Sequence, residues 1–468
     1  MSSRLDPIVV SNVSFHPDDQ WFRSEDGTGL LAGSPLTYFT VTEAGARVVD
    51  AIESNEQLPA NHGALTKRLL TVGAIHPTYD ADIETSEFTV VIPTFLRDST
   101  AQERLQSLVH SLAGPRIIIV DDCSPTAFSI AGAEVLRLSE NAGPAEARNA
   151  GLAITTTPYI AFVDDDSVVT AEQLSKLASH FIDESVSAVA PRVASVEGET
   201  LIAEYETLHS PLDLGALPAV VRPLSRVSYV PAAVLLARTS VLKEHHGFNA
   251  SMRLGEDVDL VWRLVEGGHT VRYDPSVVCH HTPRSSVRSL MRQRWGYGRS
   301  AASLDKQHKF TASPLRANIV MLVPAIALLT GYLFVALALI PLMLLWFGIT
   351  LRRTGLKVGT RVKLTLTGWL ATVRLLASAV MRAWWPPIFL IGQYSLRIGA
   401  VFVFSAFVPA MYGLMRKKPQ HTLGYIALRI LDPMAYGVGV WSGVFRERSI
   451  RCLLPVVTRG AIRLRSRA

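Results

Sequence analysis

A run of 33 residues from Asn318 to Thr350 contains no charged side chain and is almost entirely apolar. Because about 20 apolar residues of helix span the core of a bilayer, the run is long enough to cross a membrane. It is long for one pass and short for two, and Gly331 near its middle offers a hinge. A hairpin would keep the preceding domain and the following basic loop on one side, so we expect a hairpin.

Two weaker apolar stretches follow, Trp384 to Met415, which contains Arg397, and Gly424 to Val444. Either could instead be a buried helix of a large soluble protein. Basic residues that follow the first two stretches carry much of the formal net charge of +6, namely Arg352, Arg353, Lys357, Arg361, Lys363, Arg416, Lys417 and Lys418. Such flanks mark the cytoplasmic side and attract anionic lipid headgroups. We therefore expect membrane lipids, and no nucleic acid, as partners, and a multi-pass or hairpin anchor in the cell (inner) membrane.

The three cysteines, Cys123, Cys279 and Cys452, are far apart and form no CxxC pair, so neither a disulfide framework nor a zinc site is indicated. The first ten residues lack the apolar core of a secretory signal, so we expect the soluble part to stay in the cytosol. A length of 468 residues predicts two or three domains. We expect boundaries of 1–82, 83–312 and 313–468, with the last a membrane-associated helical region.

The first of these domains has the pattern of a small α+β module. Leu36 to Val41 reads as a strand, and Thr42 is placed to cap a helix that ends near Ile52. A second helical pattern covers Leu65 to Leu70. The module contains no cluster of catalytic residue types, so binding or packing is its expected role.

From Phe88 onward, strands alternate with helices. Strands are predicted at Phe88 to Pro93, Arg116 to Val120 and Tyr159 to Val163, with helices near 101–112 and 142–154. Apolar, β-branched strands alternating with helices indicate a parallel, doubly wound sheet, whose ligands lie at the carboxyl ends of the strands.

Acidic residues follow two of these strands, Asp121 and Asp122 after one and the run Asp164, Asp165 and Asp166 after another. Three adjacent carboxylates repel one another and favour a compensating cation. Mg²⁺ or Mn²⁺ is the natural candidate, since both prefer carboxylate oxygens and often share their ligands with a nucleotide diphosphate. A cap or turn cluster is the alternative for either group alone. Two clusters at one edge of a sheet favour the metal site.

Five motifs in order resemble glycosyltransferase family 2 over about residues 88–300. They are Val91-Ile92-Pro93-Thr94, Val120-Asp121-Asp122, Asn141-Ala142-Gly143 with Ala147-Arg148-Asn149, Phe162-Val163-Asp164-Asp165-Asp166, and Gly255-Glu256-Asp257. The resemblance implies an α/β, GT-A-like nucleotide-diphospho-sugar transferase fold and inversion at the anomeric carbon.

The resemblance also implies roles on the donor side. Pro93, Thr94, Asp121 and Asp122 would hold the uridine base and ribose of a UDP-sugar. Asp164 and Asp166 would lie at the ribose and at the metal that bridges the diphosphate, with the metal neutralising the leaving UDP. Asp165 also belongs to this donor side, but alternation turns it away from its neighbours, so we expect Asp165→Asn to be far milder than replacement of Asp166.

Four further residues carry roles by the same resemblance. Arg148 would add a fixed cation to the donor site, unless it is a surface helix arginine. Asp257 matches the family's base, with Glu256 beside it in the catalytic pair but pointing about 100° away. An acidic pair that stabilises a helix start is the alternative for both. His281 is a candidate third metal ligand or a structural histidine.

Arg294 and Trp295 match part of a motif of membrane-bound polymerising relatives such as cellulose and hyaluronan synthases. The arginine suits a diphosphate and the tryptophan the face of an acceptor sugar. Met291 stands where those relatives have glutamine, which puts processive synthesis with export in doubt. An amphipathic helix at the membrane surface would give the same residues.

The whole arrangement resembles the mycofactocin-system glycosyltransferases. The resemblance implies a hexosyltransferase that moves glucose from UDP-glucose onto the peptide-derived redox cofactor mycofactocin or its precursor, forming β-1,4-linked oligoglucose. The N-terminal module loosely resembles winged-helix peptide-recognition modules, although a stabilising cap fits equally. Two other functions stay open, a membrane glycosyltransferase with a lipid or cell-wall polysaccharide acceptor and a non-catalytic membrane scaffold.

Overall fold

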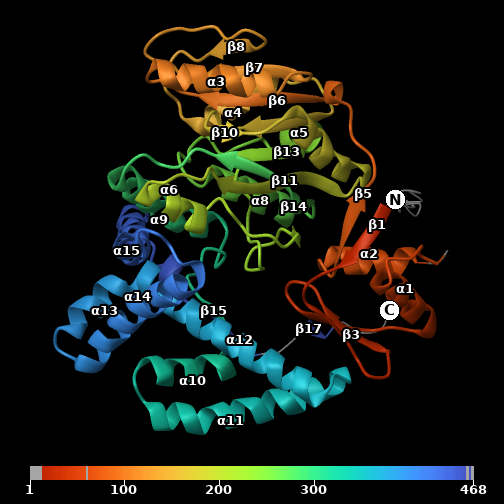
Figure 1. The fold of residues 1–468 in the computed structure, drawn as a ribbon, viewed down its shortest axis with the longest axis vertical. Helices are drawn as coiled ribbons and strands as arrows, with labels where there is room; N and C mark the ends of the chain where they lie inside the picture. The colour runs from red at the N-terminus through yellow and green to blue at the C-terminus, as the bar shows by residue number, and fades with distance from the viewer. Residues whose placement is uncertain (1–12, 60–61, 460–462, 465–468) are drawn as a thin grey trace.

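The computed structural model describes residues 13–59, 62–459 and 463–464, so the ten residues that argued against a secretory signal lie outside the described part. Figure 1 shows three regions: a large sheet with helices on both faces, a group of long helices below it, and a small N-terminal module at one side. These regions follow the order that the sequence predicted, while the proposed domain limits remain predictions.

Four parallel strands form one half of the central sheet. They are ordered β9 (Tyr159–Val163), β6 (Phe88–Thr94), β7 (Arg116–Asp121) and β8 (Glu134–Arg137). Alternate side chains of β6 point to opposite faces of the sheet and pack in two different hydrophobic cores. Val91 packs with α4 (Pro144–Ile154) and α8 (Glu256–Glu266), whereas Val90 and Ile92 pack with α3 (Ser99–Ser111) and α5 (Ala171–Ala178). The two-residue period of a strand therefore supplies both faces of the sheet.

The other half of the sheet is mixed, which corrects the prediction of a wholly parallel sheet. β13 (Val234–Arg238) is antiparallel to β9, and β11 (Val186–Ser195) is antiparallel to β13. β14 (Thr270–His281) is parallel to β11, and the short strands β10 (Ser167–Val168) and β12 (Ala219–Val220) are antiparallel to β14. Strands buried on both faces read as continuous apolar runs in either direction, so hydropathy did not reveal the reversal.

The N-terminal module contains two small sheets and two helices. β1 (Val13–Pro17) pairs with β5 (Ile75–Tyr79), and β2 (Trp21–Arg23), β3 (Gly29–Ala32) and β4 (Thr37–Thr40) form a meander. The helices are α1 (Glu43–Glu53) and α2 (Gly63–Thr71), and Thr42 caps α1 as predicted by accepting a hydrogen bond from the Gly45 N–H at 3.2 Å. β17 (Arg463–Leu464), near the C-terminus, adds to β4. A described strand that follows all the long helices in the chain therefore pairs within this N-terminal module.

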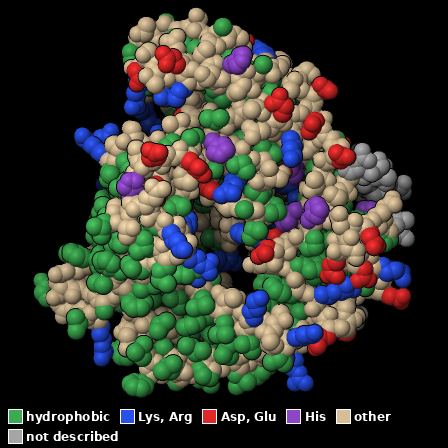
Figure 2. Space-filling view, in the orientation of Figure 1, with side chains coloured by type: hydrophobic (Ala, Val, Ile, Leu, Met, Phe, Trp, Pro, Cys, Tyr) green, Lys and Arg blue, Asp and Glu red, His purple; other side chains and the backbone are tan. Residues whose placement is uncertain are grey.

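The uncharged run divides into α10 (Ile319–Leu329) and α11 (Leu333–Thr350), and the chain turns back at Gly331, which has a φ of 78°. α12 (Val358–Ala379), a π turn (Val380–Trp384) and α13 (Trp385–Gly392) follow, and then α14 (Leu396–Lys417). Among the residues that the structure describes, three helical spans are long and apolar enough to cross a membrane, Leu333–Thr354, Val358–Gly392 and Leu396–Lys417. Figure 2 shows hydrophobic side chains covering this lower part of the molecule.

The third apolar stretch lies in α15 (Thr422–Glu447), which packs along α9 (Val287–Gln307). A Cβ atom at Gly298 of α9 would lie 1.9 Å from the Tyr436 carbonyl oxygen, and one at Gly439 of α15 would lie 2.0 Å from the Trp295 carbonyl oxygen. Only glycine permits this approach of two helix backbones. α15 thus ties the helical region to α9 of the catalytic domain.

The remaining elements connect these regions. The helices are α6 (Leu201–His209) and α7 (Thr239–Glu244), and β15 (Arg316–Asn318) pairs with β16 (Val456–Thr458). Short 3-10 turns cover Thr85–Glu87, Ser179–Ile182, Leu351–Thr354 and Arg451–Leu453.

Candidate active site

The predicted strand-end residues lie at one edge of the sheet. Thr94 ends β6, and its Oγ1 donates a hydrogen bond of 2.5 Å to Oδ2 of Asp165, just beyond β9. The N–H of Asp122, beyond β7, donates to the Thr94 carbonyl oxygen at 2.9 Å. Pro93 precedes them inside β6, paired with Val120. Parallel strands therefore bring the acidic clusters together as expected.

Asp121 and Asp122 bond to the protein itself. The Asp121 carboxylate accepts hydrogen bonds from the N–H and hydroxyl of Ser124 and pairs with Arg137. Asp122 accepts from the N–H groups of Ala142 and Gly143 at 2.7 and 3.0 Å. Both carboxylates are buried and shape the loops at the sheet edge. Their predicted roles at the base and ribose stay predictions.

Arg148 joins the two sides of the site. Its Nη2 lies 2.7 Å from Oδ1 of Asp164, and its Nη1 lies 2.7 Å from Oε1 of Glu256. The residue is only 4% exposed, so the alternative of a surface helix arginine is wrong. Burial alone would lower the pKa of the guanidinium, but the Asp164 and Glu256 carboxylates outweigh it and raise that pKa. The cation is therefore permanent.

The three carboxylates of the aspartate run turn toward different partners: Asp164 toward Arg148, Asp165 toward Thr94, and Asp166 toward Arg284 at 3.7 Å. Burial, reinforced by the neighbouring carboxylates, raises the pKa of Asp165 to about 6. Burial and the Asp164 charge also raise the pKa of Asp166. A bound cation would relieve this crowding of negative charge.

Glu256 and Asp257 open α8, directly after Gly255, whose φ is 81°. Their side chains diverge as predicted, because Glu256 reaches Arg148 while Oδ2 of Asp257 accepts a hydrogen bond from the Ala232 N–H at 3.3 Å. Burial raises the pKa of Asp257 to about 7, and the Glu256 charge adds to that rise. Asp257 can therefore exchange a proton near neutral pH.

Two tyrosines and one arginine belong to this site although sequence reasoning missed them. Burial raises the pKa of Tyr229 to about 12 and also raises that of Tyr297, and in both cases the Asp257 charge contributes. Arg284 lies beside Asp166 with its side chain 41% exposed. Its place three residues after His281, just past β14, was the one available sequence signal.

His281 lies beside the aspartate run, since β14 pairs with β10 and the Thr282 N–H donates to the Asp166 carbonyl oxygen at 2.9 Å. Its ring nitrogens contact the Ser210 hydroxyl at 2.9 Å and the Thr282 carbonyl oxygen at 3.2 Å. Within residues 13–59, 62–459 and 463–464, no three His, Cys, Asp or Glu side chains already converge as a metal site. The role of His281 as a ligand stays a prediction.

Arg294 is 3% exposed and lies in a buried ion-pair network. Its Nε is 3.1 Å from Asp432 of α15, and its Nη2 is 3.5 Å from Glu206 of α6. The guanidinium therefore connects three helices, and its predicted contact with the diphosphate stays a prediction. Trp295 lies under the Arg299 guanidinium, 5.2 Å from the ring centre, and its acceptor role likewise stays a prediction.

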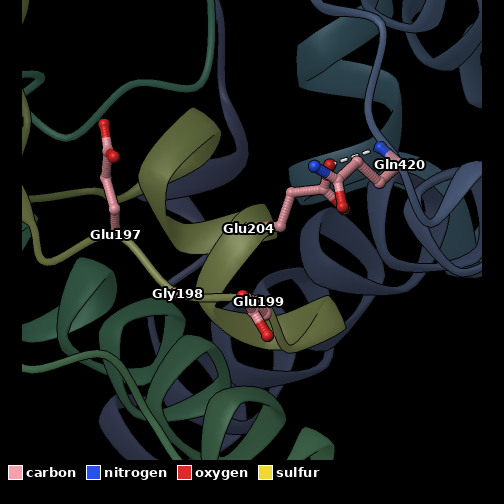
Figure 3. Close-up of a pocket in the computed structure, with 5 residues that line it drawn as sticks. All are labelled: Glu197, Gly198, Glu199, Glu204 and Gln420. Carbon is pink, nitrogen blue, oxygen red and sulfur yellow. Dashed lines mark hydrogen bonds between the residues drawn. The ribbon is translucent and has the colours of Figure 1, made fainter.

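A separate pocket of about 350 Å³ is lined by Glu197, Gly198, Glu199, Glu204 and Gln420 (Figure 3). The Glu204 carboxylate accepts hydrogen bonds from the N–H groups of Gln420 and His421, directly before α15. This acidic group therefore stabilises a helix start, where negative charge is favourable. It belongs to the junction with α15 rather than to the aspartate site.

Comparison with known proteins identifies the family. Residues 89–240 match the family described as Glycosyl transferase family 2. A protein of Mycobacterium tuberculosis named pre-mycofactocin glycosyltransferase is 35% identical over 461 residues, which cover 92% of this chain and 95% of that protein. This chain belongs to glycosyltransferase family 2.

The family match confirms the enzyme class and the GT-A-like fold, and the full-length homologue confirms the resemblance to the mycofactocin-system glycosyltransferases. The alternative of a non-catalytic scaffold is set aside. The succinoglycan biosynthesis protein ExoU of Rhizobium meliloti is 27% identical over 194 residues, 36% of this family 2 glycosyltransferase and 54% of that protein. The solved mannosyltransferase PcManGT of Pyrobaculum calidifontis is 15% identical, with a TM-score of 0.37 and coverage of 73% and 92% of the two chains. That likeness is too low to add to the argument.

Asp257→Asn should stabilise the folded enzyme increasingly as the pH rises. The folded state holds the Asp257 proton up to a pH of about 7, whereas an aspartate in the unfolded chain, with its ordinary pKa of 3.8, has already released it. The wild type therefore loses stability between these two pH values, and asparagine removes that loss. Thermal unfolding in detergent should show a larger gain in Tm for the variant at pH 8 than at pH 5. An equal difference at both pH values would contradict the raised pKa.

Proposed function

We propose that this enzyme moves glucose from UDP-glucose onto pre-mycofactocin with inversion of the anomeric carbon, and extends it as a β-1,4-linked chain. The acceptor follows from the homologue that matches almost the whole chain. The chemistry rests on one observation: Arg148 bridges Asp164, on the donor side, to Glu256, the neighbour of Asp257. That bridge sets a base candidate next to the residues proposed for the donor.

In the proposed reaction Asp257 is the general base. Its carboxylate takes the proton of the acceptor hydroxyl while the oxygen attacks the anomeric carbon from the face opposite UDP. The bond between that carbon and the phosphate oxygen breaks, and UDP leaves with its electron pair. A base with a pKa of about 7 is suited to this transfer near neutral pH. Arg148 holds Glu256 and Asp164 in place throughout.

The aspartate run suits a hard divalent cation, because burial and mutual repulsion raise the pKa values of Asp165 and Asp166. Asp166 and Asp164, with His281 as a third ligand, would hold Mg²⁺ or Mn²⁺. When bound, the ion would neutralise charge on the leaving diphosphate. Arg284 is the exposed cation next to Asp166 and is proposed to add to that neutralisation.

The remaining contacts of the donor and acceptor are assigned by position. Thr94, Asp121 and Asp122 lie on the sheet edge proposed for the uridine base and ribose. Trp295 lies in α9, whose residues Gly296 and Ser300 approach Leu254 and Gly255 at the start of α8. That neighbourhood supports Trp295 as part of the acceptor side.

The apolar helices support attachment to the cell membrane with the sheet in the cytosol. α11 exposes large apolar side chains, among them Phe334, Leu337 and Leu345. Such exposure in a soluble protein would be unfavourable, whereas lipid would cover it. The same helices favour the second candidate function, transfer to a lipid or cell-wall polysaccharide acceptor, because they bring lipid close to the catalytic domain.

Asp166→Ala should abolish metal-dependent transfer, while Asp165→Asn should be far milder, because Asp165 bonds inward to Thr94. The measurement is glucose transfer from UDP-glucose to pre-mycofactocin by the full-length enzyme in detergent, with Mn²⁺ or Mg²⁺ and after chelation. Wild-type inertness with every nucleotide sugar would refute the proposal. Transfer to a glycolipid but not to pre-mycofactocin would favour the second function.

The N-terminal module is proposed to recognise the peptide part of the acceptor or its precursor. A groove of about 360 Å³ between α1 and α2 has an apolar floor that includes Val48 and Leu65, with Arg47 and Arg68 also lining it. Apolar floor and basic side chains suit an extended peptide with acidic residues.

Arg68→Glu should therefore weaken binding of the precursor peptide by about tenfold or more, since like charge replaces attraction. Fluorescence polarisation of a labelled peptide with the full-length protein gives the affinity. Lys67→Glu is the matched control, because Lys67 is exposed on the same helix but does not line the groove. Equal losses for both variants, or no binding by the wild type, would contradict this role.

A further inference from the structure

The segment from Val221 to Ala232 belongs to the catalytic domain and contacts the N-terminal module. At the module, the Arg226 guanidinium pairs with the Asp18 carboxylate, whose side chain is 1% exposed. His76 contacts the same carboxylate at 2.9 Å, and the Arg226 N–H donates to the Ser34 hydroxyl at 3.1 Å. Arg226 is thus held through both its side chain and its backbone.

The same segment reaches the proposed base a few residues later. The Ser228 carbonyl oxygen accepts a hydrogen bond of 2.8 Å from the indole N–H of Trp262 in α8. Tyr229 adds an aromatic ring close enough for the Asp257 charge to influence its pKa. The Ala232 N–H then donates to Asp257 at 3.3 Å. The contacts of the module and the contacts of the base therefore lie on one short stretch of chain.

Internal hydrogen bonds stiffen the turn that carries Arg226 and link it to Ser228, whose hydroxyl donates to the Ser225 carbonyl oxygen at 3.2 Å. The Arg222 N–H donates to the Val227 carbonyl oxygen at 3.1 Å, and the Ser225 hydroxyl donates to the Arg222 and Val227 carbonyl oxygens at 2.8 and 2.9 Å. The Val221 N–H donates to Val271 of β14 at 2.8 Å. A displacement at Arg226 is consequently passed to Ser228 rather than absorbed within this turn.

We propose that Arg226 is a positioning residue that anchors this segment on Asp18 of the N-terminal module and so keeps the Ala232 N–H on Asp257. The inference rests on the proposed role of Asp257 as the base. It makes the N-terminal module part of the transfer apparatus, beyond any binding of peptide. A ligand that disturbs the Asp18 pair would alter the rate of transfer through this route.

The pH dependence of transfer gives a readout that a purely structural role would not change. Asp257 is faced by Glu256 on its own helix, Arg148 from α4, Tyr229 from the segment and Tyr297 from α9. The Ala232 N–H stabilises the ionised Asp257 carboxylate, and this donor is the group that the loss of Arg226 should displace. Loss of the donor should therefore move the acidic limb of the rate profile to higher pH.

The experiment compares Arg226→Gln, Arg226→Lys and Asp18→Asn with the full-length wild type in detergent. Because small displacements of catalytic groups cost up to about 100-fold in rate, we expect Arg226→Gln to lower kcat by about 10-fold or more. The KM for UDP-glucose should stay within about twofold, since the donor side is not displaced. Arg226→Lys should recover part of the rate, because lysine can still pair with Asp18.

Arg23→Gln is the matched control. Arg23 also pairs with carboxylates, Asp50 and Glu53, and its side chain is 24% exposed against 21% for Arg226. Both its partners lie within the module, so its loss should leave kcat and the pH profile as in the wild type. An equal fall in kcat for Arg23→Gln and Arg226→Gln would overturn the inference.

Two further results separate this inference from the proposed function. An active wild type, an inactive Asp257→Asn variant and an Arg226→Gln variant with unchanged kcat would overturn the positioning role alone. A lower kcat and lower Tm for Arg226→Gln with an unmoved pH limb would also overturn it, because that result describes loss of fold. A wild type that is inert toward every nucleotide sugar would instead refute the proposed function.

Discussion

The buried Arg148 guanidinium is the interaction on which the site depends. It lies between Asp164, at the end of a parallel strand, and Glu256, at the start of a helix that packs on the sheet. Without Arg148, the buried Glu256 carboxylate would lose its cation and face the half-buried Asp164 carboxylate, at a cost of roughly several kcal/mol. The cation therefore permits acidic residues to gather at one sheet edge and fixes the distance between the proposed donor and acceptor sides.

The helical region is joined to this edge by close packing and by charge. Glycines on α9 and α15 allow their backbones to meet, and Arg294 pairs with Asp432 and Glu206 across the same junction. Trp295 and Tyr297 belong to α9, so the proposed acceptor side lies on a helix that packs closely along α15. In the proposed account, the module and α9 both support the site at the sheet edge.

Much of the parallel half and its acidic edge could be predicted from the sequence. Continuous apolar strands alternating with helices indicated β6, β7 and β9. Because the carboxyl ends of parallel strands lie at one edge of a sheet, Thr94, Asp122 and Asp165 could also be predicted to lie close together. The reversal at β13 could not be predicted, because a strand buried on both faces has the same hydropathy in either direction. The hinge at Gly331 was predicted, since glycine tolerates the positive φ that the turn requires.

The contacts that could not be predicted from the sequence join residues that are far apart along the chain. Arg294 pairs with Asp432, which lies 138 residues further along the chain, and no local pattern signals that contact. Arg226 and Asp18 are separated by 208 residues, so the link between module and base was likewise hidden. By contrast, the different directions of the Glu256 and Asp257 side chains follow from helix geometry alone.

The stereochemistry of the first product tests the central claim most directly. Proton NMR of the anomeric signal, recorded while the enzyme transfers glucose from UDP-α-glucose to pre-mycofactocin, distinguishes the two configurations. Single displacement with Asp257 as base predicts a β-glucoside from the first turnover. An α-glucoside as the first product would contradict the account.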